Sequence, residues 1–315
     1  MRAMLSICIV NFNTRELLKN CLQSIYDTSK KINFEIIVVD NHSSDGSVAM
    51  IKQDFPRVIL IANDENHGYA SAVNQGVDQA KGEFILILNS DTEILPDCLS
   101  KTLEFMNDNK NAGIVGCRIL NPDLTLQRSC RSFPGILNFF SENFFLHDIF
   151  SRSRIFGRPF MSYFNYDRLA EVEIVLGAFM MIRKKTIDQI GLMDTQFFMY
   201  AEETDWCFRA KQAGWKIYFY PDAEIIHYGG GSTKQNFVPM FIEAHKSHHK
   251  FIRKYHGPAY LLGVKIILIL GVILRICLFS IATLLNLIGF KVTQDPKADL
   301  IRYWKTLRWY LIPKQ

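Results

Sequence analysis

The stretch Phe84-Ile-Leu-Ile-Leu-Asn-Ser-Asp-Thr-Glu93 decides the fold expected for this chain. An apolar run leads into a short polar cluster, with Lys81-Gly82 before the run and Pro96 after it. Such a run between turn residues is typical of a buried strand in a parallel sheet. Ligands bind at the carboxyl ends of strands in open α/β sheets, so Asp91 is a candidate site residue. The alternative is that Asp91 caps a following helix.

Short β-rich runs alternate with helical spacing through the first half of the chain. Strands are expected at residues 5–10, 34–39 and 58–61, besides the run that ends before Asp91. Between the first two, apolar residues recur with helical spacing from Leu17 to Ile25. Alternating strands and helices predict an α/β fold, in which a mainly parallel mixed sheet with right-handed crossovers is flanked by helices.

Polar residues follow each of these strands, and a parallel sheet brings the strand ends to one edge. The residues concerned are Asn11, Asn13, Asp40, Asn66 and Gly68. Asp40 can accept hydrogen bonds from a nucleobase or a ribose, or it can be a turn residue that bonds its own backbone. No G-x-G-x-x-G follows the first strand and no G-x-x-x-x-G-K-[ST] occurs, which excludes a dinucleotide fingerprint and a P-loop.

Four motifs carry a family resemblance: Ile9-Val-Asn-Phe-Asn13, Val38-Val-Asp-Asn-His-Ser-Ser-Asp-Gly-Ser47, Asn66-His-Gly-Tyr-Ala-Ser-Ala-Val-Asn74 and Leu88-Asn-Ser-Asp-Thr-Glu93. From about residue 5 to about residue 231, the chain resembles a family 2 glycosyltransferase with the Rossmann-like GT-A fold.

The resemblance implies that Asp40 contacts the nucleotide base and that Asp91 holds a divalent metal, Mn²⁺ or Mg²⁺, on the donor diphosphate. Asn89 stands where the family has the first Asp of its D-x-D element, so its role at ribose or metal-bound water stays open. Further donor contacts are placed on Asn74, Ser90, Gly177 and Ala178.

The middle of the chain is interpreted as the acceptor side. Residues 127–134 are similar to the rhamnosyltransferase-like branch of the family, and Arg128 and Arg131 are candidate phosphate ligands because guanidinium forks suit a diphosphate. Two solvated surface arginines are the alternative. Residues 136–166 are dense in Phe and Arg, which predicts an acceptor flap or a surface that meets a membrane.

A helix that opens with Glu202, Glu203 and Asp205 is the second focal stretch. Acids early and bases late in this helix agree with the helix dipole, which alone explains the charges. The family resemblance places the general base, which removes the acceptor proton, on Glu203. Glu stands there where Asp is common, so Glu202 and Asp205 remain alternatives, and Trp206 is placed with the acceptor.

A further strand is expected at residues 215–221, and the stretch after it contains His227, followed by Tyr228-Gly-Gly-Gly-Ser232. The resemblance makes it a second metal ligand or a diphosphate contact; a neutral imidazole suits Mn²⁺, whereas Mg²⁺ prefers oxygen. The alternative is a buried histidine at a strand end. Three further histidines, His245, His248 and His249, are expected on a solvated helix face.

The tail is apolar and basic. Residues 260–290 are long enough to span a membrane, but Lys265 and Arg275 interrupt them, which favours an in-plane or re-entrant anchor over a spanning helix. The aromatic and basic segment 302–310 fits the headgroup region, and an excess of Lys and Arg from residue 246 onward suits an anionic membrane better than nucleic acid. A buried pair of core helices is the alternative.

We therefore expect a catalytic domain at residues 1–245 and membrane-associating helices at 246–315. The seven cysteines form no C-x-x-C pair, and Met1 leads almost directly into a strand without a signal peptide. These features predict a reduced protein on the cytoplasmic face of a membrane, peripheral or monotopic.

The leading functional hypothesis is an inverting glycosyltransferase. It moves a sugar, rhamnose by resemblance, from a nucleoside-diphosphate sugar to a hydroxyl of a lipid-linked or cell-surface glycan, and it takes no nucleic acid. One alternative is a nucleotidyltransferase, which needs a basic glycine-rich loop after the first strand that the sequence lacks. The other is a catalytically silent membrane scaffold with the same fold.

Overall fold

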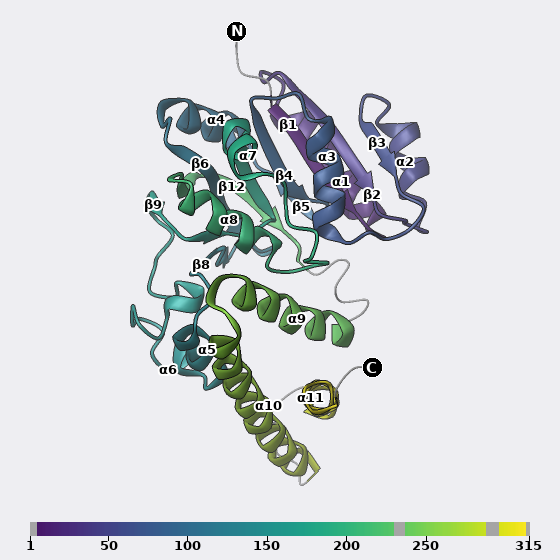
Figure 1. Ribbon diagram of the computed structural model, residues 1–315. Helices are drawn as coiled ribbons and strands as arrows, with labels where there is room; N and C mark the ends of the chain where they lie inside the picture. Colours follow the sequence, from purple (N-terminus) through teal and green to yellow (C-terminus); the bar gives the residue numbers. More distant parts are fainter. Residues whose placement is uncertain (1–4, 230–236, 288–295, 313–315) are drawn as a thin grey trace. The chain divides into compact units, whose positions relative to one another are not determined.

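The computed structural model describes residues 5–229, 237–287 and 296–312, which fall into two compact units (Figure 1). The first unit takes the chain up to Phe133 and resumes at Phe164. The second combines Pro134–Tyr163 with the chain from Asn236 onward. The boundary expected after residue 245 lies inside a helix, α9 (Phe237–His256), so the second unit starts earlier and includes an internal segment.

Ten strands of the described chain form one mixed sheet in the first unit. Its order is β3-β2-β1-β4-β11-β6-β12-β5, with β7 added beside β6 and β9 beside β12. One half is parallel, as predicted: β1 (Leu5–Asn11), β2 (Phe34–Asp40), β3 (Ile59–Ala62) and β4 (Phe84–Asn89). The other half is mixed: β5 (Thr92–Ile94), β6 (Ala112–Leu120), β7 (Leu126–Gln127), β9 (Ala170–Glu171), β11 (Phe179–Arg183) and β12 (Lys216–His227).

Helices cover both faces of this sheet (Figure 1). Successive strand residues point to opposite faces. Thus Leu5, Ile7 and Ile9 of β1 share one core with α1, α2 and α4, whereas Cys8 faces Gly76 of α3 on the other side. The helices of this unit are α1 (Arg15–Thr28), α2 (Ser47–Asp54), α3 (Tyr69–Gln79), α4 (Cys98–Asp108), α7 (Lys184–Ile190) and α8 (Glu202–Gln212).

Two stretches depart from a simple strand. Residues 174–182 form two strands, β10 (Ile174–Val175) and β11, because β10 leaves the main sheet to pair with β8 (Cys130–Arg131). The strand expected at residues 215–221 is longer, because β12 continues to His227 through an irregularity between Tyr220 and Glu224. After residue 121 the chain returns as β7, which pairs antiparallel with β6.

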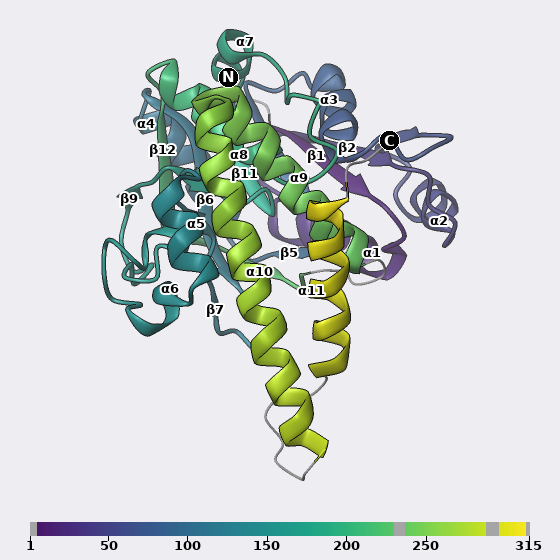
Figure 2. The same ribbon diagram turned by 60° about the horizontal axis from the view of Figure 1, so that its bottom comes forward.

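The second unit is helical. It contains α5 (Ile136–Asn143), α6 (Leu146–Ile149), a short 3-10 helix (Arg158–Phe160), α9, α10 (Pro258–Leu287) and α11 (Pro296–Leu311). Figure 2 shows α10 and α11 lying side by side, and Val272 and Ile276 of α10 share a core with Tyr303 and Leu307 of α11. The segment expected as an acceptor flap therefore belongs to the helical unit.

Arg275 is the residue that ties α10 to α5. Its guanidinium donates to the backbone oxygens of Asn143, at 2.7 Å, and Glu142, at 3.1 Å, and it lies 4.6 Å from the Phe145 ring centroid. Helix ends leave carbonyls without intrahelical partners, and here a cation satisfies them. The charge of Arg275, which interrupts the apolar run in the sequence, is thus satisfied by carbonyls at the end of α5.

The rest of α10 is strongly apolar, and among the described helices it is the one long and apolar enough to cross a membrane. One side chain per turn is exposed over much of its length: Leu262, Ile266, Leu270, Ile273, Ile281 and Leu284. His245 of α9, expected on a solvated face, is buried, and its Nδ1 lies 2.8 Å from the Tyr310 hydroxyl. The expected tail residues 288–290 and the turn residues 230–232 lie outside the described chain.

Candidate active site

The sheet brings Asp91 and His227 together. Asp91 directly precedes β5, and β12 runs antiparallel to β5 with His227 opposite Thr92. The backbone N–H of Tyr228 donates to the Asp91 carbonyl at 2.9 Å, which fixes this register. As a result, His227 Nε2 lies 3.3 Å from Asp91 Oδ1, and both side chains are largely buried. Residues far apart in sequence thereby form one acidic corner at the ends of the strands.

The donor set of this corner fits a divalent cation. His227 Nδ1 lies 2.6 Å from Gln127 Oε1, so Nδ1 has an oxygen acceptor and Nε2 faces the carboxylate. Asn89 Nδ2 lies 3.4 Å from the same Nε2. Across the described ranges, no group of three His, Cys, Asp or Glu side chains converges. A metal here would have two protein ligands, which leaves positions for phosphate and water oxygens.

Glu202 and Glu203 form a second acidic corner at the start of α8. The two residues before the helix, Tyr200 and Ala201, both have positive φ, at 67° and 65°. Non-glycine residues rarely adopt this conformation, and such strain concentrates at functional sites. It delivers the two glutamates into a buried position where Oε2 of each has no hydrogen-bond partner among the described residues.

Burial raises the pKa of both carboxyl groups. The pKa of Glu202 is raised well above its ordinary value, first by desolvation and then by the charge of Glu203. For Glu203, backbone hydrogen bonds and the positive charge of Arg131 oppose the increase. The electrostatics therefore keep one proton on this pair more tightly than on an exposed glutamate.

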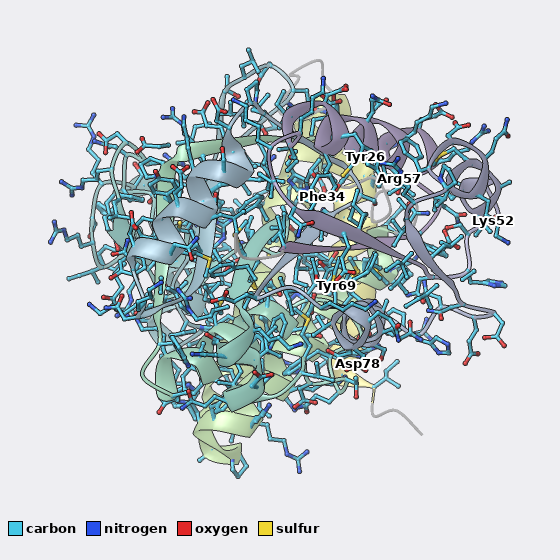
Figure 3. All side chains as sticks on the ribbon, turned by 90° about the horizontal axis from the view of Figure 1, so that it is seen from above. Tyr26, Phe34, Lys52, Arg57, Tyr69 and Asp78 are labelled. Carbon is cyan, nitrogen blue, oxygen red and sulfur yellow. The ribbon has the colours of Figure 1, made fainter. Side chains whose placement is uncertain are left out.

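Tyr69 links the two acidic corners, and the sequence analysis had missed it. Its hydroxyl donates to Asn89 Oδ1 at 3.2 Å, and burial together with the charges of Glu202, Glu203 and Asp91 raises its pKa well above normal. Tyr69 is the first residue of α3 and is labelled near the middle of Figure 3. Its position directly after Gly68 was the available signal.

Gly68 and Asn66 shape the turn that precedes Tyr69. Gly68 has φ of 83°, and an added Cβ would lie 2.7 Å from the Phe198 ring, so no larger residue fits. Asn66 Oδ1 accepts hydrogen bonds from the Gly68 N–H, at 3.0 Å, and from Asn41 Nδ2, at 2.8 Å. These two residues position the turn through internal contacts.

Asp40 and Asn11 lie together at the carboxyl ends of β1 and β2. Asp40 is almost fully buried; Oδ2 accepts from Asn11 Nδ2 at 2.8 Å, and Oδ1 accepts from the Ser43 N–H at 2.9 Å. In this structure Asp40 has the turn-stabilising contacts of the alternative interpretation. Asn13 has φ of 52°, and its Oδ1 accepts from the Ser44 N–H at 2.8 Å.

Other predicted donor residues separate into two groups. Ser90, next to Asp91, shares a 2.8 Å hydrogen bond with Thr14, and the Ala178 carbonyl accepts from the Asn89 N–H at 3.2 Å. Gly177 lies beside the Tyr69 hydroxyl. Asn74, in contrast, exchanges two hydrogen bonds with the Met193 backbone and supports that loop.

Two residues of α8 have structural contacts. Asp205 is fully buried, and its Oδ2 lies 2.8 Å from Arg209 Nε, whose guanidinium also bonds the Leu192 carbonyl. Trp206 is fully buried, and its indole N–H donates to the Gly191 carbonyl at 2.9 Å. Trp206 is therefore a core residue, and Asp205 is the ion-pair partner of Arg209.

The two predicted phosphate ligands differ in their surroundings. Arg128 is exposed. Arg131 Nη1 donates to the Arg128 and Cys130 carbonyls, at 3.1 Å and 2.9 Å, and its charge acts on Glu203. The structure therefore brings Arg131, but not Arg128, into electrostatic contact with the acidic site.

The fold is the GT-A fold, with one acidic corner at the strand ends and a second at the start of α8. The chain belongs to glycosyl transferase family 2, whose model matches residues 6–191. It uses a nucleotide-sugar donor, in keeping with that family. The match covers Asp91 and ends before α8, so the second corner rests on the structure alone.

Curated relatives extend the likeness beyond that range. The chain is 26% identical over 237 residues to an N-acetylglucosaminyl-diphospho-decaprenol L-rhamnosyltransferase of Mycobacterium tuberculosis, covering 70% of this chain and 75% of the relative. It is 29% identical over 238 residues to a low-salt glycan biosynthesis hexosyltransferase, Agl10, of Haloferax volcanii, covering 71% and 66%.

Solved structures share the fold. One is the mannosyltransferase PcManGT of Pyrobaculum calidifontis in complex with GDP-Man and Mn²⁺, with a TM-score of 0.59 at 16% identity, covering 99% of this chain and 89% of that one. Another is GalNAc-T7 with UDP, GalNAc and Mn²⁺, with a TM-score of 0.53 at 15% identity, covering 71% and 43%. At these identities the likeness concerns the fold alone.

Proposed function

We propose that the chain is an inverting, metal-assisted glycosyltransferase in which Asp91 and His227 hold the cation and Glu203 is the general base. The observation that carries the proposal is the pairing of His227 Nε2 with Asp91 Oδ1 at 3.3 Å, on the strand ends where α/β folds bind ligands. Mn²⁺ or Mg²⁺ bound there would offset charge that develops on the leaving diphosphate. The Mn²⁺ in both structural relatives agrees with this assignment.

Glu203 is proposed as the base because its carboxylate is buried and oriented at the helix start, with one oxygen left unpaired. A general base needs a free oxygen within hydrogen-bond reach of the acceptor hydroxyl. Its raised pKa increases its basicity, and Arg131 keeps the increase within limits. The pKa of Glu202 is raised further, so Glu202 would keep its proton when Glu203 is ionised, because two adjacent buried carboxyl groups do not both ionise readily.

For the donor nucleotide we retain Asp40, Asn11 and Asn89 as contacts at the strand ends. Asn11 and Asp40 form a preorganised pair, and nucleotide binding would replace or extend their mutual hydrogen bond. Asn89 links Tyr69 to His227, so it is placed to respond to the metal and the sugar together.

A lipid-linked acceptor and a rhamnosyl donor are supported by the name of the mycobacterial relative, which acts on a diphospho-decaprenol compound. Arg131 is then the proposed contact for an acceptor phosphate, because its positive charge acts on the proposed base. A guanidinium suits such a phosphate through paired N–H donors.

We propose that α10 lies in the plane of a membrane, on its cytoplasmic face, and does not cross it. One side of α10 packs on α5 and α11 and carries Arg275, whose charge is satisfied by α5 carbonyls. The other side presents the exposed row from Leu262 to Leu284. A helix with one protein-facing side and one apolar side matches an interfacial anchor, and basic residues of α9 favour anionic lipid.

The membrane proposal is tested by flotation with vesicles of neutral or anionic lipid. Leu270→Asp with Ile273→Asp puts two charges on the exposed row, and we expect most of the protein to leave the vesicle fraction. Leu124→Asp with Leu169→Asp, at two exposed apolar residues of the first unit, is the matched control. Equal flotation of the Leu270/Ile273 variant and wild type would exclude this row as the lipid-binding surface.

The reaction is tested by incubating the protein with radiolabelled dTDP-rhamnose, other nucleotide sugars and Mn²⁺, with and without a polyprenyl-diphosphate-linked sugar. We expect release of nucleoside diphosphate that depends on metal and on Asp91. Because metal stabilisation of a leaving group is worth several kcal/mol, Asp91→Ala should lose about 1000-fold or more in transfer. A fully active Asp91→Ala enzyme would end the metal assignment.

A further inference from the structure

A chain of side-chain hydrogen bonds runs from the protein surface to the proposed metal ligand His227. It passes through the β6–β7 hairpin, in order Asp123, Thr125, Asn121, Gln127 and His227. The four links measure 2.6, 2.9, 2.8 and 2.6 Å. Every link lies within the first unit, and the register places Gln127 and His227 on strands that flank β6.

The direction of each hydrogen bond follows from Asp123. An ionised carboxylate only accepts, and hydrogen bonds from Thr125 lower the pKa of Asp123, which keeps it ionised. Thr125 therefore donates to Asp123 and accepts from Asn121 Nδ2. Asn121 is left with its oxygen, Oδ1, toward Gln127, and this oxygen must accept from Gln127 Nε2.

The orientation of the Gln127 amide is fixed a second time by the backbone. Its Nε2 also lies 3.3 Å from the His227 carbonyl oxygen. A flipped amide would place Oε1 against two oxygens, those of Asn121 and of the His227 backbone, and lose both hydrogen bonds. Gln127 Oε1 must therefore face the imidazole, where it can accept only a proton carried by Nδ1.

We propose that Gln127 is a positioning residue that holds His227 in the Nδ1–H tautomer, so that the Nε2 lone pair is directed at the cation site beside Asp91. This inference rests on the proposed function, because it takes His227 as a metal ligand. Ligating histidines commonly donate their second ring N–H to a neighbouring oxygen, which fixes both tautomer and ring orientation. Here that oxygen comes from an amide anchored by a surface hairpin.

Loss of the Gln127 oxygen has a specific consequence. With no acceptor at Nδ1, the imidazole proton is free to move to Nε2, because the Nε2–H can donate a hydrogen bond to Asp91 Oδ1 at 3.3 Å. His227 Nε2 would then donate a hydrogen bond to Asp91 Oδ1, so the two atoms that would bind the cation would instead be occupied by each other. The site would lose cation affinity although both ligand side chains are still present.

The test uses Gln127→Met, which preserves length and volume but removes the oxygen, and measures ring-nitrogen NMR shifts of His227 in metal-free protein at pH 8. We expect a protonated Nδ1 in wild type and a protonated Nε2 in the variant. Mn²⁺ binding, followed by electron paramagnetic resonance of the free ion, should weaken about tenfold or more in the variant. Leu124→Ala, an exposed site in the same hairpin, should change neither measurement.

The outcomes separate the two proposals. A protonated Nε2 in wild type, or an unchanged tautomer in Gln127→Met, would overturn the positioning role of Gln127. Unchanged Mn²⁺ affinity in His227→Ala would instead remove His227 from the metal site, and with it the basis of this inference. If His227→Ala binds Mn²⁺ more weakly but Gln127→Met binds it as wild type does, the positioning role of Gln127 is rejected and the proposed function stands.

Discussion

The Asp91–His227 corner and the Glu202–Glu203 corner satisfy their polar atoms in different ways. At the first, strand pairing sets the register, and each ring nitrogen of His227 has a polar neighbour. At the second, two positive-φ residues precede the helix, and a carboxylate oxygen of each glutamate is buried without a partner. One corner is preorganised by hydrogen bonds, whereas the other holds unfavourable electrostatic energy.

The two corners should therefore respond differently to mutation. Removing a group from the hydrogen-bonded corner leaves partners unsatisfied, which costs stability as well as function. Neutralising a group at the second corner removes a charge that burial destabilises, so function and stability can change in opposite directions.

Glu203→Gln should have the largest effect of the substitutions at the second corner. The amide cannot take up the proton of the acceptor hydroxyl, so kcat should fall by about 1000-fold, within the usual range for a general base. Donor binding should change little, since the fold and the metal corner remain. Single-turnover transfer and nucleotide binding measure the two separately; unimpaired transfer would assign the base elsewhere.

Asp205→Asn should affect stability and not chemistry. Its carboxylate is fully buried and paired with Arg209 Nε at 2.8 Å, so the substitution leaves a charged guanidinium without its partner. Breaking such a buried pair costs about 3 kcal/mol in the free energy of unfolding. Urea unfolding measures the loss, while activity per folded molecule should remain near wild type, in contrast to Glu203→Gln.

The rate of transfer should rise with pH over a range above the ordinary glutamate pKa of about 4.3. Burial raises the pKa of Glu203, and the base works only when deprotonated, so the acidic limb of kcat shifts upward in pH. Along this limb the rate should change about tenfold per pH unit. If the acidic limb of kcat instead falls at the pH where an exposed glutamate titrates, a group other than Glu203 controls the rate.

Glu202→Gln should have the smallest effect, and it should be stabilising. The pKa of Glu202 is raised in the folded state, so the folded protein binds more protons than the unfolded chain at pH above about 4.3, and its stability falls as pH rises. The amide does not titrate. At pH 8 we expect a gain of about 1 kcal/mol, or about 2–4 °C in Tm, that disappears near pH 4. Equal stability of both proteins across this pH range would contradict a raised pKa of Glu202 in the folded protein.

The α/β fold, the strand that ends just before Asp91 and the helix that begins at Glu202 were all predictable from the sequence, because apolar runs and turn residues are local signals. The family resemblance supplied the proposed roles of Asp91 and Glu203. Local patterns gave no account of Tyr69, which reaches the site only because α3 starts beside Asn89.

What the sequence determined by itself is therefore the set of elements and the acidic residues at their ends. Tertiary structure alone decided that Thr92 pairs with His227, that Gln127 faces the imidazole, and that Arg275 closes the end of α5. Each of these is a contact between segments at least 100 residues apart. Strand register and helix packing fix such contacts, and neither is encoded in a short window of sequence.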